Sequence, residues 1–222
     1  MAQRRTRASK GRAKRAVIFD FDGTIADSFE YVLAFLLAEA KNTTPFTPAQ
    51  KKQLRKMSMG RLTLHLGIPF WRGPLVYFKG RRVMRAHMEQ VQPFPGVVEA
   101  IRQLHADGWR LFIATSNSRH NVRQLLRRYD IEQCFTAVRG GAGVTGKAPM
   151  IRQLLMRYRL PRMSTWYVGD ETGDVVAAAR AGVHCLAVGW GFADPADLKT
   201  MEPTAYVQRA ADIPKVLEAW KK

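Results

Sequence analysis

Short apolar runs alternate with helical patterns over most of the chain. Residues 16–20 form a short apolar run that ends in polar residues and Gly23, which is typical of a buried strand that feeds a tight turn. A helix that ends at Gly108 separates this run from a second one at 109–114. Later strands are predicted at 136–138, 165–168, 184–188 and 205–207, and later helices at 119–129, 149–158, 173–181 and 213–220. This alternation predicts an α/β fold with a doubly wound parallel sheet.

Residues 28–92 break the alternation. Helices are predicted here at 29–40, 48–57 and 74–88, and no run typical of a buried strand occurs. The simplest organisation is an all-helical cap, residues 28–92, inserted after the first strand of a core formed by residues 16–27 and 93–222. Phe70, Trp71 and Tyr77 are expected to pack inside this cap.

The composition favours a soluble, cytoplasmic protein without membrane contact. Of 222 residues, 46% are apolar, but no stretch approaches the ~20 consecutive apolar residues of a membrane span. Residues 1–15 contain no apolar leader, and Cys134 and Cys185 lie in apolar contexts without metal-ligand spacing. No disulfide framework is expected, and the sequence favours no particular oligomeric state.

The charge is strongly positive, with 36 Lys and Arg against 18 Asp and Glu and a net charge of +18. Residues 1–15 contain seven cations and no acid, and the predicted cap carries a net +8. Such a field attracts polyanions. Residues 1–15 have no aromatic residue for base stacking and are predicted to form a solvated, disordered arm. A non-specific contact of this arm with nucleic acid or another polyanion stays open.

Two carboxylates follow the first predicted strand. Asp20 and Asp22 are two positions apart, so an extended backbone directs both side chains to the same side. Ligands of open parallel sheets bind outside the carboxyl ends of the strands. One carboxylate could attack phosphorus while the other moves the proton of the leaving group, and Gly23 permits the sharp turn that follows. A pair of solvated turn aspartates is the alternative.

Polar residues also follow the other predicted strands. Thr115, Ser116 and Asn117 offer a hydroxyl and turn amides to a phosphoryl oxygen, although such a turn is more often a helix N-cap. Lys147 places an ammonium just before a helix. Gly141 to Lys147 also matches dinucleotide-binding and Walker A patterns, but Ala148 stands where Walker A needs a hydroxyl.

Acidic residues follow the predicted strand at 165–168. Asp170 and Asp174 are four positions apart across a strand-to-helix turn, with Glu171 between them. Mg²⁺ takes one or two carboxylates together with substrate phosphate and water. These residues are therefore candidate metal ligands, with helix capping as the alternative.

In this order, each at the end of a strand, these segments resemble the haloacid dehalogenase-like hydrolases. The resemblance is to the aspartate-nucleophile phosphatases with a helical cap, and it covers about residues 16–215. Three segments carry it: 17–28, the cap re-entry at 94–97, and 167–170 together with Asp174. The length of the cap and the Trp190-Gly191-Phe192 loop look most like phosphoglycolate phosphatases.

The resemblance implies a role for each matched residue. Asp20 would be the nucleophile and a ligand of the cofactor Mg²⁺, and Asp22 the general acid and base, with its carbonyl on the metal. Asp170 would bind Mg²⁺, and Asp174 would orient metal-bound water or Lys147, with Glu171 as a substitute. Thr115 and Lys147 would bind the phosphoryl group that is transferred. The residues expected to contact the substrate are Gly23, Ser116 and Asn117. The lysine motif departs from the family pattern, because Ala148 separates Lys147 from Pro149.

The predicted activity is hydrolysis of a small acidic phosphomonoester such as 2-phosphoglycolate through an aspartyl-phosphate. Arg61, in a turn of the cap, is the candidate contact for a substrate carboxylate, with a solvated arginine as the alternative. Two other functions stay open because of the charge. One is a phosphatase for nucleotides or nucleic-acid ends, and the other is a non-catalytic nucleic-acid-binding protein that retains the fold.

Overall fold

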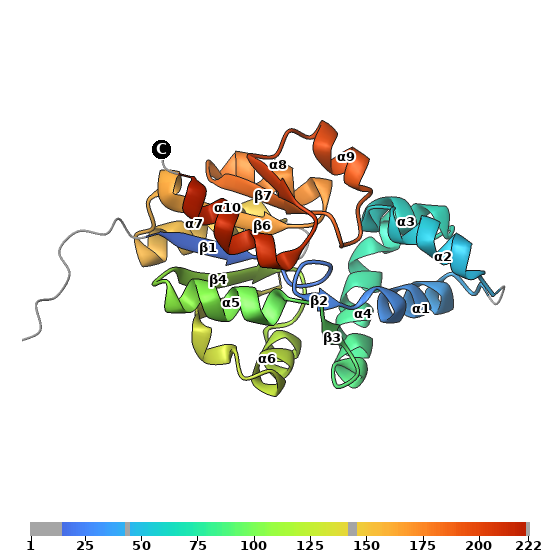
Figure 1. Ribbon diagram of the computed structural model, residues 1–222. Helices are drawn as coiled ribbons and strands as arrows, with labels where there is room; N and C mark the ends of the chain where they lie inside the picture. Colours follow the sequence, from blue (N-terminus) through green and yellow to red (C-terminus); the bar gives the residue numbers. More distant parts are fainter. Residues whose placement is uncertain (1–14, 43–44, 142–145, 221–222) are drawn as a thin grey trace, which may run out of the picture.

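The computed structural model describes residues 15–42, 45–141 and 146–220 (Figure 1). Its main sheet has six strands in the order β5-β4-β1-β6-β7-β8, and every pairing is parallel. The strands are β1 Ala16–Phe19, β4 Arg110–Thr115, β5 Phe135–Gly140, β6 Thr165–Gly169, β7 His184–Val188 and β8 Ala205–Val207. Successive strands run outward from β1 in one direction and then in the other, so the predicted doubly wound α/β fold is confirmed.

Helices cover both faces of this sheet. They are α5 Val97–Ala106, α6 Arg119–Arg128, α7 Lys147–Tyr158, α8 Thr172–Ala181, α9 Pro195–Thr200 and α10 Ile213–Ala219. Among the described residues of the core, short 3-10 helices accompany them at Glu132–Cys134, Arg162–Ser164 and Ala210–Asp212. Successive side chains of a strand point to opposite faces, and β1, β4, β6 and β7 are buried along almost their whole length, so the sheet has an apolar layer on each face.

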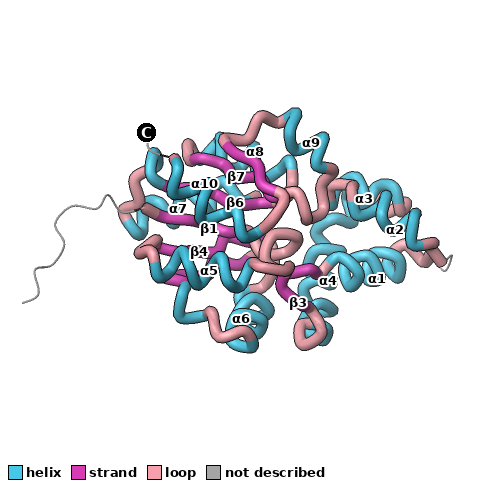
Figure 2. The backbone as a smooth tube through the Cα atoms, viewed as in Figure 1, coloured by secondary structure: helices cyan, strands magenta, loops and turns pink. Residues whose placement is uncertain are grey.

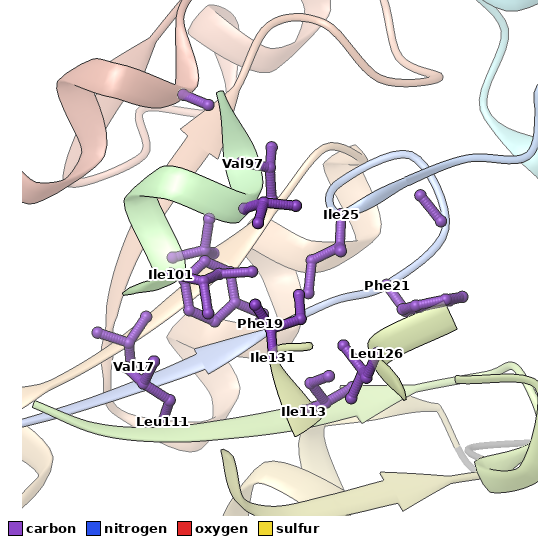
Figure 3. Close-up of a cluster of buried hydrophobic side chains, with 14 of the residues drawn as sticks. Val17, Phe19, Phe21, Ile25, Val97, Ile101, Leu111, Ile113, Leu126 and Ile131 are labelled. Carbon is purple, nitrogen blue, oxygen red and sulfur yellow. The ribbon is translucent and has the colours of Figure 1, made fainter. Parts of the chain in front are cut away.

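One layer of the core packs the odd-numbered residues of β1 and β4 against α5, α6 and α10. Its members include Val17, Phe19, Ile101, Leu111 and Leu126, all fully or almost fully buried (Figure 3). The even-numbered residues face the opposite layer, formed mainly by α7 and α8. The sheet is therefore rigid where its strands end, which fixes the side chains that follow them.

The cap lies beyond the carboxyl ends of the strands, and loops fill the space between sheet and cap (Figure 2). A two-stranded antiparallel stem, β2 Ala26–Asp27 and β3 Gln92–Pro93, joins it to the core. Between these strands the described residues form α1 Phe29–Glu39, α2 Pro48–Arg55, α3 Met59–His65, a 3-10 helix Phe70–Arg72 and α4 Gly73–His87. The all-helical character of this insertion agrees with the fold prediction, while the exact domain boundaries stay a prediction.

The cap has its own apolar cluster, separate from the two core layers. Phe29, Leu33, Leu36 and Leu62 are buried in it, and Phe192 of the core joins them. The expectation that Phe70 and Trp71 pack inside the cap is wrong, because Phe70 is 77% exposed and Trp71 is 69% exposed. The cap core instead contains apolar residues of α1, α2, α3 and α4, among them Leu33, Leu54, Leu62 and Val76.

The basic arm predicted at residues 1–15 falls outside the described residues except for Arg15. The Arg15 guanidinium lies 3.0 Å from the Glu218 carboxylate and 4.4 Å from the centre of the Trp109 ring. Arg15 is therefore part of the folded core rather than of an arm. Within the described part of the chain, no helix has the length and apolar character needed to cross a membrane.

Candidate active site

The carboxyl ends of three neighbouring strands bring the predicted motifs together. Asp20 follows β1, Thr115 ends β4 and Asp170 follows β6, and β1 pairs in parallel with both other strands. Lys147 is the first residue of α7, which begins two residues earlier than the sequence predicts. The sheet therefore gathers at one edge side chains that are far apart in the sequence.

A buried ion-pair network joins Asp20, Lys147 and Asp174. The Lys147 ammonium lies 2.6 Å from Asp20 Oδ2 and 2.5 Å from Asp174 Oδ1. Burial disfavours the charged form of Lys147, but Asp174 and Asp20 outweigh burial and hold its pKa well above the ordinary value. Burial also raises the pKa of Asp20 to about 7, although Lys147 acts in the opposite direction. Further positive charge near Asp20 would lower this pKa and favour the ionised carboxylate.

Asp22 lies beside this network in a setting that favours its protonated form. Its Oδ1 accepts hydrogen bonds from Ser28 Oγ at 2.7 Å and from Asn117 Nδ2 at 3.1 Å. Burial outweighs these hydrogen bonds and raises the pKa of the Asp22 carboxyl. A raised pKa suits a carboxyl group that gives a proton to a leaving group.

Residues 115–117 form a turn on the same side of the site. Asn117 N donates to Thr115 Oγ1 at 3.1 Å, so the buried threonine hydroxyl is held in place. The N-cap of α6 is Ser118, whose Oγ accepts from Asn121 N at 3.1 Å. Because Ser118 caps the N-terminus of α6, residues 115–117 are not used as the helix cap and can contact a ligand in the site.

Asp170 is fixed by its neighbours and by close glycine contacts. Its Oδ1 accepts from Thr24 Oγ1 and its Oδ2 from Phe192 N, each at 2.8 Å. Gly23 has a φ of +80°, and a Cβ added to it would lie 2.1 Å from Asp170 Oδ2. Gly23 therefore supplies both the left-handed backbone and the space for this carboxylate. Burial raises the pKa of Asp170 well above its ordinary value, and the charge of Asp174 adds to this effect.

Asp174 and Glu171 occupy different positions in the turn between β6 and α8. Asp174 Oδ2 accepts from the backbone N–H groups of Asp170 and Glu171 at 3.1 Å, while its Oδ1 faces Lys147. Glu171 Oε1 accepts from Met59 N of the cap at 2.9 Å. Asp174 therefore contacts the Lys147 ammonium and the backbone of the turn, whereas Glu171 contacts the helical cap through Met59.

Three of these carboxylates could hold a divalent cation. Asp20, Asp170 and Asp174 are buried and each offers an oxygen, and these oxygens all lie within 4.8 Å of one another. Asp20 Oδ1 is buried and has no hydrogen-bond donor among the described residues. Lys147 is the cation paired with this group, so the three carboxylates carry an excess of negative charge when they are ionised. A hard cation with oxygen ligands fits this donor set.

A cavity of about 230 Å³ opens between this group and the cap. The core contributes a polar floor that includes Asp20, Asp22, Ser116, Asn117 and Lys147. The cap contributes a wall that is mostly apolar, with the polar exceptions Thr63, Tyr77 and Arg81. The site can therefore hold a small molecule with a charged end on the core and an organic part under the cap.

Arg61 lies outside this cavity. Its side chain is 74% exposed, and Nη1 is 3.3 Å from the Asp197 carboxylate on α9. The structure thus brings the predicted core residues together around this cavity, while Arg61 lines a separate cavity whose lining also includes Lys147. A contact between Arg61 and the substrate stays a prediction.

The sequence analysis missed two residues of the cavity wall on α4. Tyr77 was expected in the cap core, but its hydroxyl donates to the Ser116 carbonyl at 2.6 Å. Arg81 follows it by one helical turn and lines the same cavity. Their spacing of four positions on a predicted helix was the available signal, since it puts both on one face.

Comparison with known proteins agrees with this geometry. The chain is 32% identical to a phosphoglycolate phosphatase from Synechococcus elongatus, over 90% of this chain and 95% of that protein. It is 27% identical to a 5'-nucleotidase from Pseudomonas aeruginosa, over 91% and 95%. Among solved structures, a predicted phosphatase from Clostridium acetobutylicum has a TM-score of 0.77 at 20% identity, covering 93% of this chain and all of that one. The family model for haloacid dehalogenase-like hydrolases matches residues 17–188, and the chain belongs to that family.

Proposed function

We propose that this phosphatase hydrolyses a small acidic phosphomonoester, such as 2-phosphoglycolate, with Asp20 as the nucleophile and Mg²⁺ as the cofactor. The observation that carries the proposal is the buried contact of Lys147 with both Asp20 and Asp174 at the floor of the cavity. An ammonium and a nucleophilic carboxylate at one point suit phosphoryl transfer, which depends on positioning and charge stabilisation. The substrate type is that named for the relative from Synechococcus elongatus.

In the first step the Asp20 carboxylate attacks phosphorus, and the bond between phosphorus and the leaving oxygen breaks. Asp22 gives its proton to that oxygen, so the alcohol leaves neutral. Lys147 and the turn at Thr115 hold the phosphoryl oxygens. In the second step water attacks the aspartyl-phosphate, Asp22 takes the proton back, and release of phosphate restores Asp20.

Asp20, Asp170 and the backbone carbonyl of Asp22 would hold the Mg²⁺, with Asp174 orienting Lys147 beside it. The cation supplies charge neutralisation between the nucleophile and the phosphoryl oxygens, and it favours the ionised form of Asp20. The buried Asp20 Oδ1, which has no donor among the described residues, supports this assignment.

The test is an Asp20→Asn variant assayed with Mg²⁺ on a panel of phosphorylated metabolites. We expect kcat to fall by about 10³-fold or more, because an amide is a poor nucleophile and a weaker metal ligand. Asp130→Asn, the same change at an exposed residue beyond α6, is the matched control and should behave as the wild type. Turnover by a folded Asp20→Asn protein at the wild-type rate would exclude the mechanism.

Asp22→Asn supplies a second arm of this experiment. The general acid matters most for a poor leaving group, so ethyl phosphate should lose about 10²- to 10⁴-fold in kcat/KM. The loss for p-nitrophenyl phosphate should be smaller, because p-nitrophenolate leaves without a proton. Equal losses for the two esters would contradict the role of Asp22.

A nucleotide is the second candidate substrate, because a 5'-nucleotidase is among the relatives and the net charge is +18. The cap wall over the cavity limits the space for a base and a ribose. Inclusion of nucleoside monophosphates in the same panel distinguishes the two candidates by the ratio of their kcat/KM values.

A further inference from the structure

The cavity contains one cap cation whose charge is not balanced. Lys147 and Arg81 are the cationic residues that line it within the described part of the chain. Lys147 is paired with Asp20 and Asp174. In residues 15–42, 45–141 and 146–220, no carboxylate lies within ion-pair distance of the Arg81 guanidinium. Residues 142–145 and 43–44 contain no acid by sequence.

Several other cations of the cap are paired with carboxylates. Glu39 pairs with Arg72 and Lys79, and Asp27 pairs with Arg55. None of these paired residues lines the cavity. Arg81 is half-buried, and a desolvated cation without an anion is unfavourable.

Arg81 is also held in position. Its guanidinium lies 5.5 Å from the centre of the Tyr77 ring, with Nη1 3.5 Å from the Tyr77 hydroxyl. Its backbone carbonyl accepts from Asn121 Nδ2 of α6 at 3.2 Å. On the other side, a Cβ added to Gly141 would lie 3.5 Å from Nη1. The guanidinium is thus set between α4 and the end of β5 before any substrate arrives.

Hydrogen bonds connect the neighbourhood of the Arg81 guanidinium to the predicted phosphoryl site. Tyr77, which contacts the guanidinium, donates to the carbonyl of Ser116, and the next residue, Asn117, contacts Asp22. A substrate with its phosphoryl group at Asp20 therefore extends toward Arg81 if its organic part enters the cavity. A short acid places its second anionic group at that end.

The rest of the cap wall limits the substrate further. Val32, Phe35, Leu36 and Val76 line the cavity and offer no side-chain hydrogen-bond group. Against these side chains a sugar phosphate would lose the water bound to its hydroxyls, and on the cap wall Thr63 and Tyr77 are the neutral polar side chains that could replace it. A hydroxy acid esterified with phosphate carries a carboxylate for Arg81 and few other polar groups.

We propose that Arg81 is the specificity-determining residue of this enzyme and that it binds the carboxylate of a phosphorylated hydroxy acid. This inference rests on the proposed function and assigns to Arg81 the contact that the sequence suggests for Arg61. The planar guanidinium can bind a carboxylate through two parallel hydrogen bonds, which fixes the substrate's orientation.

The experiment compares 2-phosphoglycolate with ethyl phosphate, which has the same chain length and lacks the carboxylate. The wild type should prefer phosphoglycolate in kcat/KM. Arg81→Gln should lower this preference by about 10- to 100-fold, mainly through KM, because a charge-assisted contact is lost. Arg81→Lys should retain part of the preference, because the positive charge remains but the planar group that donates two parallel hydrogen bonds is lost.

Arg82→Gln is the matched control, since Arg82 is exposed on the same helix and does not line the cavity. It should keep the wild-type preference. Equal loss for both esters in Arg81→Gln would indicate a structural role and overturn the proposal. The proposal is also overturned if Arg61→Gln removes the preference while Arg81→Gln keeps it.

A binding measurement separates this inference from the proposed function. Calorimetric titration of the Asp20→Asn protein should show tighter binding of phosphoglycolate than of ethyl phosphate. Adding Arg81→Gln should remove that difference. If the wild type turns over neither ester, the proposed function fails, and the binding difference alone then decides the role of Arg81. Equal binding of the two esters overturns it.

Discussion

At the scale of single residues, the position of Asp170 depends on two glycines as well as on its hydrogen bonds. Gly23 faces one side of the carboxylate, and Gly191 faces the other. A Cβ added to Gly191 would lie 2.2 Å from Asp170 Oδ2 and 2.3 Å from Asp170 Cβ. Neither distance can be accommodated without moving Asp170 or the 190–192 loop.

Gly191→Ala therefore tests whether this carboxylate holds the cation. We expect overpacking to lower the free energy of unfolding by about 1–3 kcal/mol. The Mg²⁺ concentration for half-maximal activity should rise by about 10-fold or more, because displacement of one carboxylate weakens the site. Thermal unfolding and a Mg²⁺ titration of activity measure the two effects.

Gly173→Ala is the control for this change. Gly173 lies in the first turn of α8, close to the same acidic residues, but a Cβ there meets nothing within 4 Å. Its stability and Mg²⁺ requirement should match those of the wild type. An unchanged Mg²⁺ requirement in Gly191→Ala would show that Asp170 is not a metal ligand.

The core residues of the site could be predicted from the sequence, because each follows an apolar run that forms a strand. Parallel strands end at one edge, so Asp20, Lys147 and Asp170 had to converge if the sheet formed. The cap offered no such constraint. Its Lys and Arg residues look alike in sequence, and the structure is needed to show that Arg81 lines the cavity beside Asp20 and Asp22 whereas Arg61 lines another one.

At the scale of elements, the core helices and strands lie close to their predicted ranges, and the differences concern short or irregular segments. The sequence analysis did not predict β2, β3, α3 or α9, which have two to seven residues each. Elements of this length give too few positions for a period to be recognised. Their stability comes from packing between distant segments.

The start of α7 shows how local chemistry shifts a boundary. The sequence analysis placed it at Pro149, but the helix begins at Lys147, so Pro149 occupies its first turn. Proline is tolerated there because the first N–H groups of a helix have no partner within it. This extension places Lys147 at the helix start, where its side chain reaches Asp20 and Asp174.

At the scale of the whole molecule, the acidic site couples stability to pH and to the cation. Burial raises the pKa of Asp20 from 3.8 to about 7, and burial raises the pKa values of Asp22, Asp170 and Glu171 in the same direction. Without a cation, the folded protein retains protons that the unfolded chain loses as the pH rises above 3.8. The contribution of these groups to stability therefore falls as the pH rises toward neutrality.

The stabilisation by Mg²⁺ should change with pH in the opposite direction. A cation competes with protons for the same carboxylates, so the rise in Tm on adding Mg²⁺ should be larger at about pH 8 than at about pH 5.5. Differential scanning calorimetry with saturating Mg²⁺ measures this shift, and Asp170→Asn should reduce it. A shift in Tm that is equal at both pH values would argue against a site made of these carboxylates.

The last prediction concerns the positive charge of the chain, which has two separate parts. The cap carries a net +8, and this charge should raise the encounter rate of an anionic substrate. Residues 1–14 carry six further cations, whereas Arg15 belongs to the core through Glu218 and Trp109. Deletion of residues 1–14, which keeps Arg15, should therefore leave kcat/KM for a small phosphomonoester within about 2-fold of the wild type, because screening weakens distant charges.

The same deletion should weaken binding to RNA or DNA and reduce its dependence on salt, because fewer counterions are released. Filter binding of random-sequence RNA at two salt concentrations, with the full and the shortened chain, measures both effects. Loss of most activity on the small substrate would show that residues 1–14 belong to the site. Sequence-specific binding that resists salt would instead favour a nucleic-acid substrate, because contacts with bases do not depend on counterion release.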